Sequence, residues 1–340
     1  MSIAGIAGNS NVYALLLAGG SGTRLAPLST PEKPKQFVEV FSERPMITET
    51  SHRIASLVPS ERQFVATNRR YMHHVMNCLP SMQRAHIHSE PEGFNRDTGP
   101  AVAIFARRLA LMDPDATAVV LASDHWIEDD DAFAANLADA IHMAQTTGTV
   151  VNFGIRPERI EPGFGYIKRG AAHLHTAGHL ATDFVQKPPY EIAKRFVDDD
   201  YLWNSGMSVF QVSTFNELLA RFQPNLANSL ALFLNSNTTG AVIDPIIDHL
   251  YRSEMPKISV DSAVFEGAAA MGMMSVLELT TGWSDVGLPK SLMPLFIGGR
   301  ISPPDHVASI IRSMMIANDS SSRRHACPEI ARLIASYGRI

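Results

Sequence analysis

The chain of 340 residues contains only two cysteines, Cys78 and Cys327, which lie far apart and outside any Cys-x-x-Cys pair. They imply neither a disulfide framework nor a zinc site, and a reducing compartment fits them. No apolar run reaches the roughly 18–20 residues that a membrane span requires. Residues 1–11 lack the basic start of a signal peptide. We therefore expect a soluble, cytoplasmic protein without a membrane partner.

A basic stripe is also missing, because charged residues of both signs are spread along the chain and the net charge is −5. Nucleic-acid-binding proteins concentrate lysine and arginine on one face, so we expect no nucleic-acid partner. Apolar residues make up 45% of the sequence. That share is enough to bury the core of one large α/β domain or of two smaller ones.

Apolar segments in the first half predict alternating strands and helices. The expected strands cover residues 12–17, 63–67, 85–88, 118–122 and 149–153, and the expected helices cover 46–57, 68–79, 98–112 (with Thr98 as the cap) and 130–146. Short continuous apolar runs separated by helices are typical of an α/β fold with a doubly wound, Rossmann-like, mostly parallel sheet. Ligands of such sheets bind beyond the carboxyl ends of the strands.

The second half predicts a mixed arrangement. Strands are expected at residues 165–169, 179–185 and 271–277, the first two as a small antiparallel insertion, and helices at 190–197, 213–222 and 244–251. We assign residues 12–290 to one domain. The remaining segment, 291–340, is an atypical C-terminal tail with weak helical patterns at 307–315 and 328–337.

A glycine-rich loop, LAGGSGTRL at residues 17–25, directly follows the first expected strand. Glycines let backbone N–H groups approach phosphate oxygens, and the Arg24 guanidinium is a fixed fork of donors for phosphate. A Rossmann loop would have glycine or alanine where Leu25 stands, and a Walker A loop would need a Gly-Lys-Ser/Thr tripeptide. The loop therefore predicts a phosphate site of another type.

A second basic segment, KPKQF at residues 33–37, is close enough along the chain to fold over the same ligand. Taken alone, its lysines could belong to a solvated loop. Together with the glycine loop, however, it resembles the signature of the sugar-1-phosphate nucleotidyltransferases. The resemblance implies that Arg24 and Lys35 bind a nucleoside triphosphate and stabilise charge on its α-phosphate.

Further segments resemble the same family in the same order, and in particular its mannose-1-phosphate guanylyltransferases. They are SDH at residues 123–125, FGIRP at 153–157, GFGYI at 163–167, FVQKP at 184–188, WNSGM at 203–207, ISVD at 258–261 and GWSDVG at 282–287. The resemblance spans residues 12–287. It implies that residues 12–290 are a catalytic domain with the fold of the nucleotide-diphospho-sugar transferases.

The resemblance also assigns roles to individual residues. Asp124 and Asp285 would ligate Mg²⁺, the implied cofactor, and carboxylates suit that hard ion. Arg24 and Lys35 would complete the catalytic set. The nucleotide would contact Gly19, Gly20, Ser21, Gly22, Thr23, Glu90 and Asp97. The sugar phosphate would contact Gly165, Gln186, Lys187 and Asn204.

Three departures from the family pattern bear on specificity. The loop between Glu90 and Arg96 is two residues longer, with Asp97 in place of asparagine, and it lies beside the base and ribose in relatives. Gln186 replaces a glutamate that contacts sugar hydroxyls. The dipeptide 288–289 is Leu-Pro instead of a small residue and tryptophan.

We expect guanylyl transfer from GTP to mannose 1-phosphate, giving GDP-mannose and pyrophosphate. The same chemistry with another nucleotide or hexose 1-phosphate stays open. A non-catalytic, sugar-nucleotide-binding regulatory subunit is the alternative from another class. The composition leaves the oligomeric state open, with a homodimer as one possibility.

Two other polar groups are interpreted as structural. His86 and His88 could share one face of a strand and bind a metal, but without a third ligand we expect them to be surface histidines. The acidic run at residues 128–131 is expected at the N-terminus of a helix, where the helix dipole favours acidic side chains.

Overall fold

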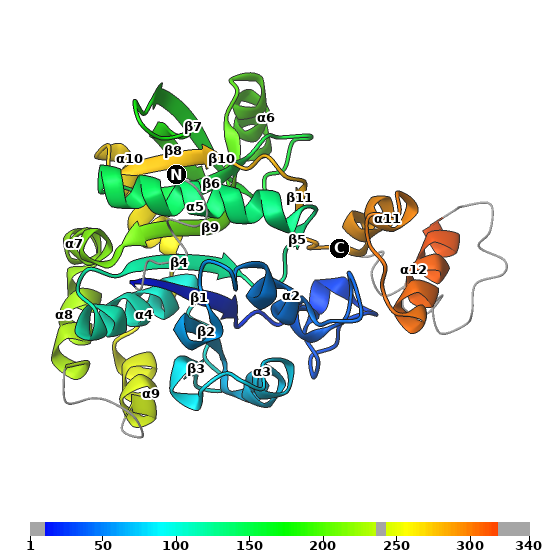
Figure 1. The fold of residues 1–340 in the computed structure, drawn as a ribbon, viewed down its shortest axis with the longest axis horizontal. Helices are drawn as coiled ribbons and strands as arrows, with labels where there is room; N and C mark the ends of the chain where they lie inside the picture. The colour runs from blue at the N-terminus through cyan, green and yellow to red at the C-terminus, as the bar shows by residue number, and fades with distance from the viewer. Residues whose placement is uncertain (1–10, 236–242, 319–340) are drawn as a thin grey trace.

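The computed structural model describes residues 11–235 and 243–318, which form an α/β structure around one large sheet (Figure 1). The strand order is β3-β2-β1-β4-β9-β6-β10-β8-β7. The strands of this sheet are β1 (Val12–Ala18), β2 (Gln63–Asn68), β3 (Ile87–Glu90), β4 (Thr117–Ala122), β6 (Val150–Ile155), β7 (Gly165–Ala172), β8 (His179–Gln186), β9 (Leu202–Gln211) and β10 (Met274–Glu278). A separate two-stranded ribbon pairs β5 (Trp126–Ile127) with β11 (Trp283–Ser284).

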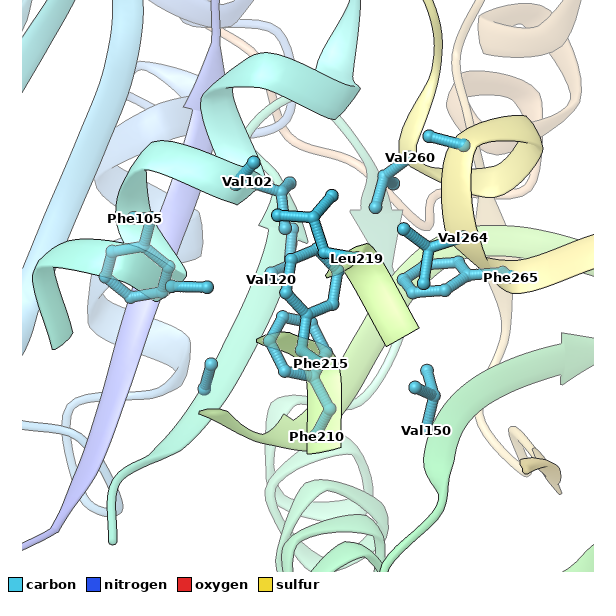
Figure 2. Packing of buried hydrophobic residues seen from close by; sticks show 14 of the residues in the cluster. Val102, Phe105, Val120, Val150, Phe210, Phe215, Leu219, Val260, Val264 and Phe265 are labelled. Carbon is cyan, nitrogen blue, oxygen red and sulfur yellow. The ribbon is translucent and has the colours of Figure 1, made fainter. Parts of the chain in front are cut away.

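Each face of the sheet carries its own helices, because side chains of a strand alternate between the faces. In β1, for example, Leu15 joins one buried cluster, whereas Leu16 joins the other. Helices α2 (Met46–Arg53), α3 (Met72–Cys78) and α5 (Asp130–Thr147) pack on the Leu16 side; α4 (Thr98–Met112), α7 (Val212–Phe222), α8 (Pro224–Phe233), α9 (Ile243–Ser253) and α10 (Glu266–Ala270) pack on the Leu15 side. Aromatic rings from β9, α7 and the π-helical turn Asp261–Phe265 meet on the Leu15 side, where Phe210 lies 4.5 Å from Phe215 and 6.5 Å from Phe265 between ring centroids (Figure 2).

The sheet is mixed, and its antiparallel pairing extends beyond the small insertion that the sequence predicts. β1 pairs in parallel with β2 and β4, but β9 runs antiparallel between β4 and β6. The segment of β9 was not predicted as a strand, because Asn204, Ser205 and Ser208 interrupt its apolar pattern. All three are buried. The antiparallel pair β7–β8 extends the same sheet through contacts with β10 and β9.

Several local expectations are also corrected. The strand expected at residues 85–88 is Ile87–Glu90, and the preceding residues form a 3₁₀ turn. His88 is fully buried, and the half-buried His86 ring stacks on Phe64 at 4.2 Å, so the expectation of surface histidines is wrong. Burial also lowers the pKa of His88 to about 3, so its ring is neutral inside the core.

Acidic residues cap the N-termini of α4 and α5. Asp97, rather than the expected Thr98, caps α4 by accepting from the Thr98 N–H at 2.8 Å. Asp129 caps α5 by accepting from the N–H groups of Asp131 and Ala132 at 3.0 and 2.9 Å. The helix-terminus interpretation of the acidic run is therefore confirmed.

The tail begins with α11 (Pro289–Ile297) and α12 (Asp305–Asn318), which lie at one end of the molecule (Figure 1). The second of these covers the helical pattern expected at residues 307–315. The pattern at 328–337 lies outside the described residues. Among the helices that the structure describes, none combines the length and apolar character needed to cross a membrane.

Candidate active site

The glycine loop and the lysine segment pack against each other directly. Gly22 has φ of 59°, and a Cβ there would lie 2.4 Å from the backbone nitrogen of Lys35. Only glycine tolerates both that conformation and that approach. The Gln36 amide donates to the carbonyls of Ala18 and Gly20 at 2.9 and 2.8 Å, which ties the segment to the end of β1. The two segments therefore form one unit.

The structure brings three candidate catalytic residues together at this unit. The Lys35 ammonium lies 3.0 Å from the Asp124 carboxylate. It also donates to the backbone carbonyl of Asp285 at 2.8 Å, across 250 positions of sequence. Asp124 follows β4, and the Ser123 hydroxyl beside it donates to the Leu17 carbonyl at 2.7 Å. Arg24 lies on the neighbouring 3₁₀ turn and is exposed.

Electrostatics keep the Asp124 carboxyl ionised. Burial alone would raise its pKa, but the Lys35 ammonium opposes that effect, and the pKa lies below its ordinary value. Burial lowers the pKa of His125, so its imidazole is neutral. The Trp283 indole donates to His125 Nδ1 at 3.2 Å, which places the imidazole proton on Nε2, the nitrogen 4.0 Å from Asp124. His125 was not among the predicted site residues, although it adjoins Asp124.

The carboxylates of Asp124 and Asp285 suit a hard divalent cation. Gly287 leaves room for the Asp285 carboxylate, since a Cβ at position 287 would lie 2.7 Å from Asp285 Oδ2. Within residues 11–235 and 243–318, no group of three or more His, Cys, Asp or Glu side chains forms a closed metal site. Mg²⁺ is commonly held by one or two carboxylates together with water and substrate phosphates. The residues present therefore fit that ion.

Strand register assembles the candidate sugar-phosphate residues. Gly165 on β7 lies opposite Gln186 of β8 and Asn204 of β9. A Cβ on Gly165 would lie 2.6 Å from Gln186 Oε1 and 3.2 Å from Asn204 Cβ, so the glycine permits this approach. Lys187 follows directly, with φ of 48° and an exposed side chain. All four candidates therefore lie together.

Asn204 is held by buried hydrogen bonds. Its Oδ1 accepts from Asn152 and from the Gly206 N–H, both at 3.1 Å, and its Nδ2 donates to Asp261 at 2.8 Å. Burial raises the Asp261 pKa to about 6, although the bond from Asn204 opposes that shift. Glu266 accepts from the Gln186 N–H at 3.0 Å. Neither acid was among the predicted site residues.

The candidate nucleotide residues separate into two places. Gly19, Ser21 and Glu90 line a cavity of about 250 Å³. The rest of its lining is Asn68, Arg70, Tyr71, Glu92, Gly93, Phe94 and Asn95. Asp97 does not line the cavity. It lies near Asp261 instead, and its charge contributes to raising the pKa of that residue. Burial raises the pKa of Glu90, against the hydrogen bond from the Arg96 N–H at 2.6 Å.

Comparison with known proteins gives a family match over most of the chain. Residues 13–296 match the family model described as nucleotidyl transferase. XanB, a xanthan biosynthesis protein of Xanthomonas campestris pv. campestris strain B100, is 35% identical over 287 residues, covering 84% of this chain and 59% of its own. A mannose-1-phosphate guanylyltransferase of Escherichia coli K12 is 34% identical over 296 residues, covering 83% and 59%. The chain thus spans 59% of the length of these relatives.

A solved structure is similar as well. The Thermus thermophilus protein titled mannose-1-phosphate geranyltransferase superposes with a TM-score of 0.74 at 31% identity, covering 84% of this chain and 79% of its own. A Helicobacter pylori protein titled mannose-6-phosphate isomerase shares the fold alone, with a TM-score of 0.62 at 22% identity, over 81% of this chain and 99% of its own. The mixed sheet and its helices have the α/β fold of nucleotide-diphospho-sugar transferases.

Proposed function

The chain belongs to the nucleotidyl transferase family, as its motifs predict, and we propose that it transfers a guanylyl group from GTP to mannose 1-phosphate. The products are GDP-mannose and pyrophosphate. The meeting of Lys35 with Asp124 and Asp285 beside the glycine loop carries the proposal. The name of the Escherichia coli relative supports the choice of substrates.

Bond formation and cleavage both occur at the α-phosphorus of GTP. A phosphate oxygen of mannose 1-phosphate attacks in line, and the bond to the bridging oxygen of pyrophosphate breaks. The nucleophile is already an anion, so catalysis consists mainly of positioning and charge stabilisation. Arg24 and Lys35 bind the triphosphate and the leaving pyrophosphate. A divalent cation on Asp124 and Asp285, which we propose to be Mg²⁺, neutralises phosphate charge when bound.

The sugar phosphate binds on the other side of the α-phosphorus. Lys187 holds its phosphate, and its exposed ammonium suits a ligand approaching from solvent. Asn204, Gln186 and the Gly165 backbone orient the sugar. The buried bonds of Asn204 fix its amide before the substrate arrives, which lowers the entropic cost of orientation.

The cavity beside Glu90 is our proposed site for the base. Guanine presents N1–H and N2–H₂ donors, and the carboxylates of Glu90 and Glu92 are acceptors at the cavity wall. Adenine would leave acceptors that the bound base covers unpaired, at about 1–3 kcal/mol for each group. We therefore expect GTP to be preferred over ATP. The lengthened loop contributes Phe94 and Asn95 to the same wall.

A pyrophosphate-release assay tests the proposal. With mannose 1-phosphate as acceptor, kcat/KM is compared for GTP, ATP, UTP and dTTP, and then for other hexose 1-phosphates with the best nucleotide. The assay is repeated after deletion of Phe94 and Asn95. Equal use of all four nucleotides would refute guanine specificity, and loss of discrimination only in the deletion variant would assign base reading to the lengthened loop. No turnover with any pair would favour the non-catalytic alternative.

We also propose that the enzyme is cytoplasmic. The free thiol of Cys78 is compatible with the reducing conditions of that compartment. Burial also raises the pKa of that thiol to about 11, which keeps it unreactive. Light scattering on the purified chain tests whether it forms a homodimer.

A further inference from the structure

A satellite hydrophobic cluster lies behind the charged centre of the candidate active site. It contains Leu25, Leu28, Val38, Val40, Phe41, Met46, Trp126, Val286, Leu292, Leu295, Ile301, Val307 and Ile311. Chain neighbours of all four candidate catalytic residues contribute to it, namely Leu25 beside Arg24, Val38 after Lys35, Trp126 after Asp124 and Val286 beside Asp285. The four catalytic segments are thus anchored in one small core.

The tail supplies the other side of this cluster. Leu292 and Leu295 come from α11, Val307 and Ile311 from α12, and Ile301 from the connection between the two helices. The connection is also hydrogen-bonded to the lysine side of the site, because the N–H of Ser302 donates to the Phe41 carbonyl at 2.9 Å. The tail is therefore part of the wall behind the catalytic segments.

One polar residue of the connection, Arg300, contacts the β5–β11 ribbon. Its guanidinium donates to Glu128 through Nε at 2.7 Å and Nη2 at 2.5 Å. The same guanidinium carbon lies 4.7 Å from the centroid of the Trp126 ring. Gly282 makes room for the pair, since a Cβ there would lie 2.3 Å from Glu128 Oε2 and 2.8 Å from Arg300 Nη2. Arg300 thus lies against the end of the ribbon where Glu128 and Gly282 meet.

The ribbon connects the two candidate metal ligands. Asp124 lies two residues before β5, and Asp285 follows β11 directly. Trp126 pairs with Ser284 and Ile127 with Trp283, while the Glu128 N–H donates to the Gly282 carbonyl at 2.9 Å. Because the ribbon has only two residues in each strand, few backbone hydrogen bonds define its geometry. The Arg300–Glu128 ion pair lies at the end of the ribbon opposite the two aspartates, and it bears on their separation through this short ribbon and through Trp126.

We propose that Arg300 is a positioning residue for nucleotidyl transfer, acting through Glu128 and Trp126 on the spacing of Asp124 and Asp285. The proposal rests on the proposed function of the site. Two carboxylates that share one cation must keep a fixed separation, and a misplacement of about 1 Å can cost about 100-fold in rate. A half-exposed ion pair contributes little to folding stability. Loss of Arg300 should therefore affect catalysis more than stability.

The test compares Arg300→Gln with wild type in the full chain. We expect kcat to fall about tenfold and the Mg²⁺ concentration for half-maximal rate to rise, with an unchanged KM for mannose 1-phosphate. Binding of Mn²⁺ in the presence of a non-hydrolysable GTP analogue, followed by electron paramagnetic resonance, should weaken in parallel. The melting temperature should stay within a few degrees of wild type.

Arg84→Gln is the matched control. Arg84 also forms a half-exposed ion pair, with Asp244, and its side chain is 41% exposed against 42% for Arg300. It lies before β3, at the opposite end of that strand from Glu90. This variant should keep wild-type kcat and Mn²⁺ affinity. Equal losses in the two arginine variants would contradict the proposal, as would wild-type behaviour of Arg300→Gln.

A double-mutant cycle tests whether Arg300 acts through Glu128. Glu128→Gln should reproduce the loss seen in Arg300→Gln, and the double variant should lose no more than either single variant. Additive losses would show that Arg300 does not act through Glu128 and would overturn the proposal. If wild type released no pyrophosphate, the proposed function would fail, whereas the Mn²⁺ comparison would still decide whether Arg300 positions the two carboxylates.

Discussion

The metal side and the sugar side of the candidate active site are built differently. Arg24, Lys35, Asp124 and Asp285 lie on loops and 3₁₀ turns, and their positions depend on a separate hydrophobic cluster shared with the tail. The sugar-side residues Gly165, Gln186 and Asn204 lie on paired strands of the main sheet, where register alone aligns them. Lys187 follows the last residue of β8.

The two sides differ in what holds their residues in place. Backbone hydrogen bonds to the neighbouring strands fix the position of a strand residue. A buried polar side chain such as Asn204 is fixed further by its own hydrogen bonds to Asn152 and Asp261. A loop residue has no such ladder, so its position must come from the packing of its apolar neighbours. Substitutions on the two sides should therefore fail in different ways.

The largest effect is expected for the metal ligands. Asp124→Asn and Asp285→Asn each remove a negative charge from the proposed cation site and should lower kcat about 100-fold or more while the fold persists. Steady-state rates over a series of Mg²⁺ concentrations, with circular dichroism as the check on folding, measure this. Near wild-type kcat at saturating Mg²⁺ would remove the substituted residue from the mechanism.

The next largest effects are expected on substrate affinity, and they should differ between the metal side and the sugar side. Lys187→Ala should raise KM for mannose 1-phosphate about 10–100-fold with little change for GTP, because a charged hydrogen bond to the sugar phosphate is lost. Arg24→Ala should instead raise KM for GTP and lower kcat. Initial rates with each substrate varied in turn measure both variants. A Lys187→Ala enzyme that loses only GTP affinity would reverse the assigned orientation of the ligands.

Glycine substitutions test the packing of the glycine loop. Gly22→Ala imposes a left-handed conformation on a side chain, at about 1–3 kcal/mol, and brings its Cβ to 2.4 Å from the Lys35 backbone. Thermal unfolding should show a clear loss of stability. Gly20→Ala is the matched variant, because no protein atom lies within 4 Å of the Cβ it adds. It should melt like wild type but bind GTP less tightly, and equal melting temperatures for both variants would contradict the packing argument.

The last prediction concerns pH and the sugar side, and its effect on stability is spread over more than two pH units. Burial raises the pKa of Asp261 from an ordinary 3.8 to about 6, so the folded state holds its proton more tightly than the unfolded state does. The stability contributed by this proton is complete below about pH 4 and is lost as pH rises through about 6, up to about 3 kcal/mol. Denaturant unfolding between pH 4 and 7 should give a shallower slope for Asp261→Asn, and identical slopes would refute the assignment.

Most of the first half of the fold could be predicted from the sequence. The strand at residues 12–17, the helix at 98–112 and the helix at 130–146 lie within two residues of the observed bounds, because strong apolar periodicity and short-range signals define them. β9 could not be predicted in this way. Its buried Asn204, Ser205 and Ser208 look like loop residues until the partners that satisfy them are known.

The candidate site likewise has features that local sequence predicts and contacts that it does not. Residue types at short spacing were enough to predict the phosphate-type loop, the basic segment, the two candidate metal ligands and the family. No local pattern shows that Lys35 contacts both Asp124 and the Asp285 backbone, that Asn204 donates to Asp261, or that the tail packs behind the catalytic segments. Those contacts join positions far apart in the chain, and their geometry depends on sheet register and burial, which no local pattern encodes.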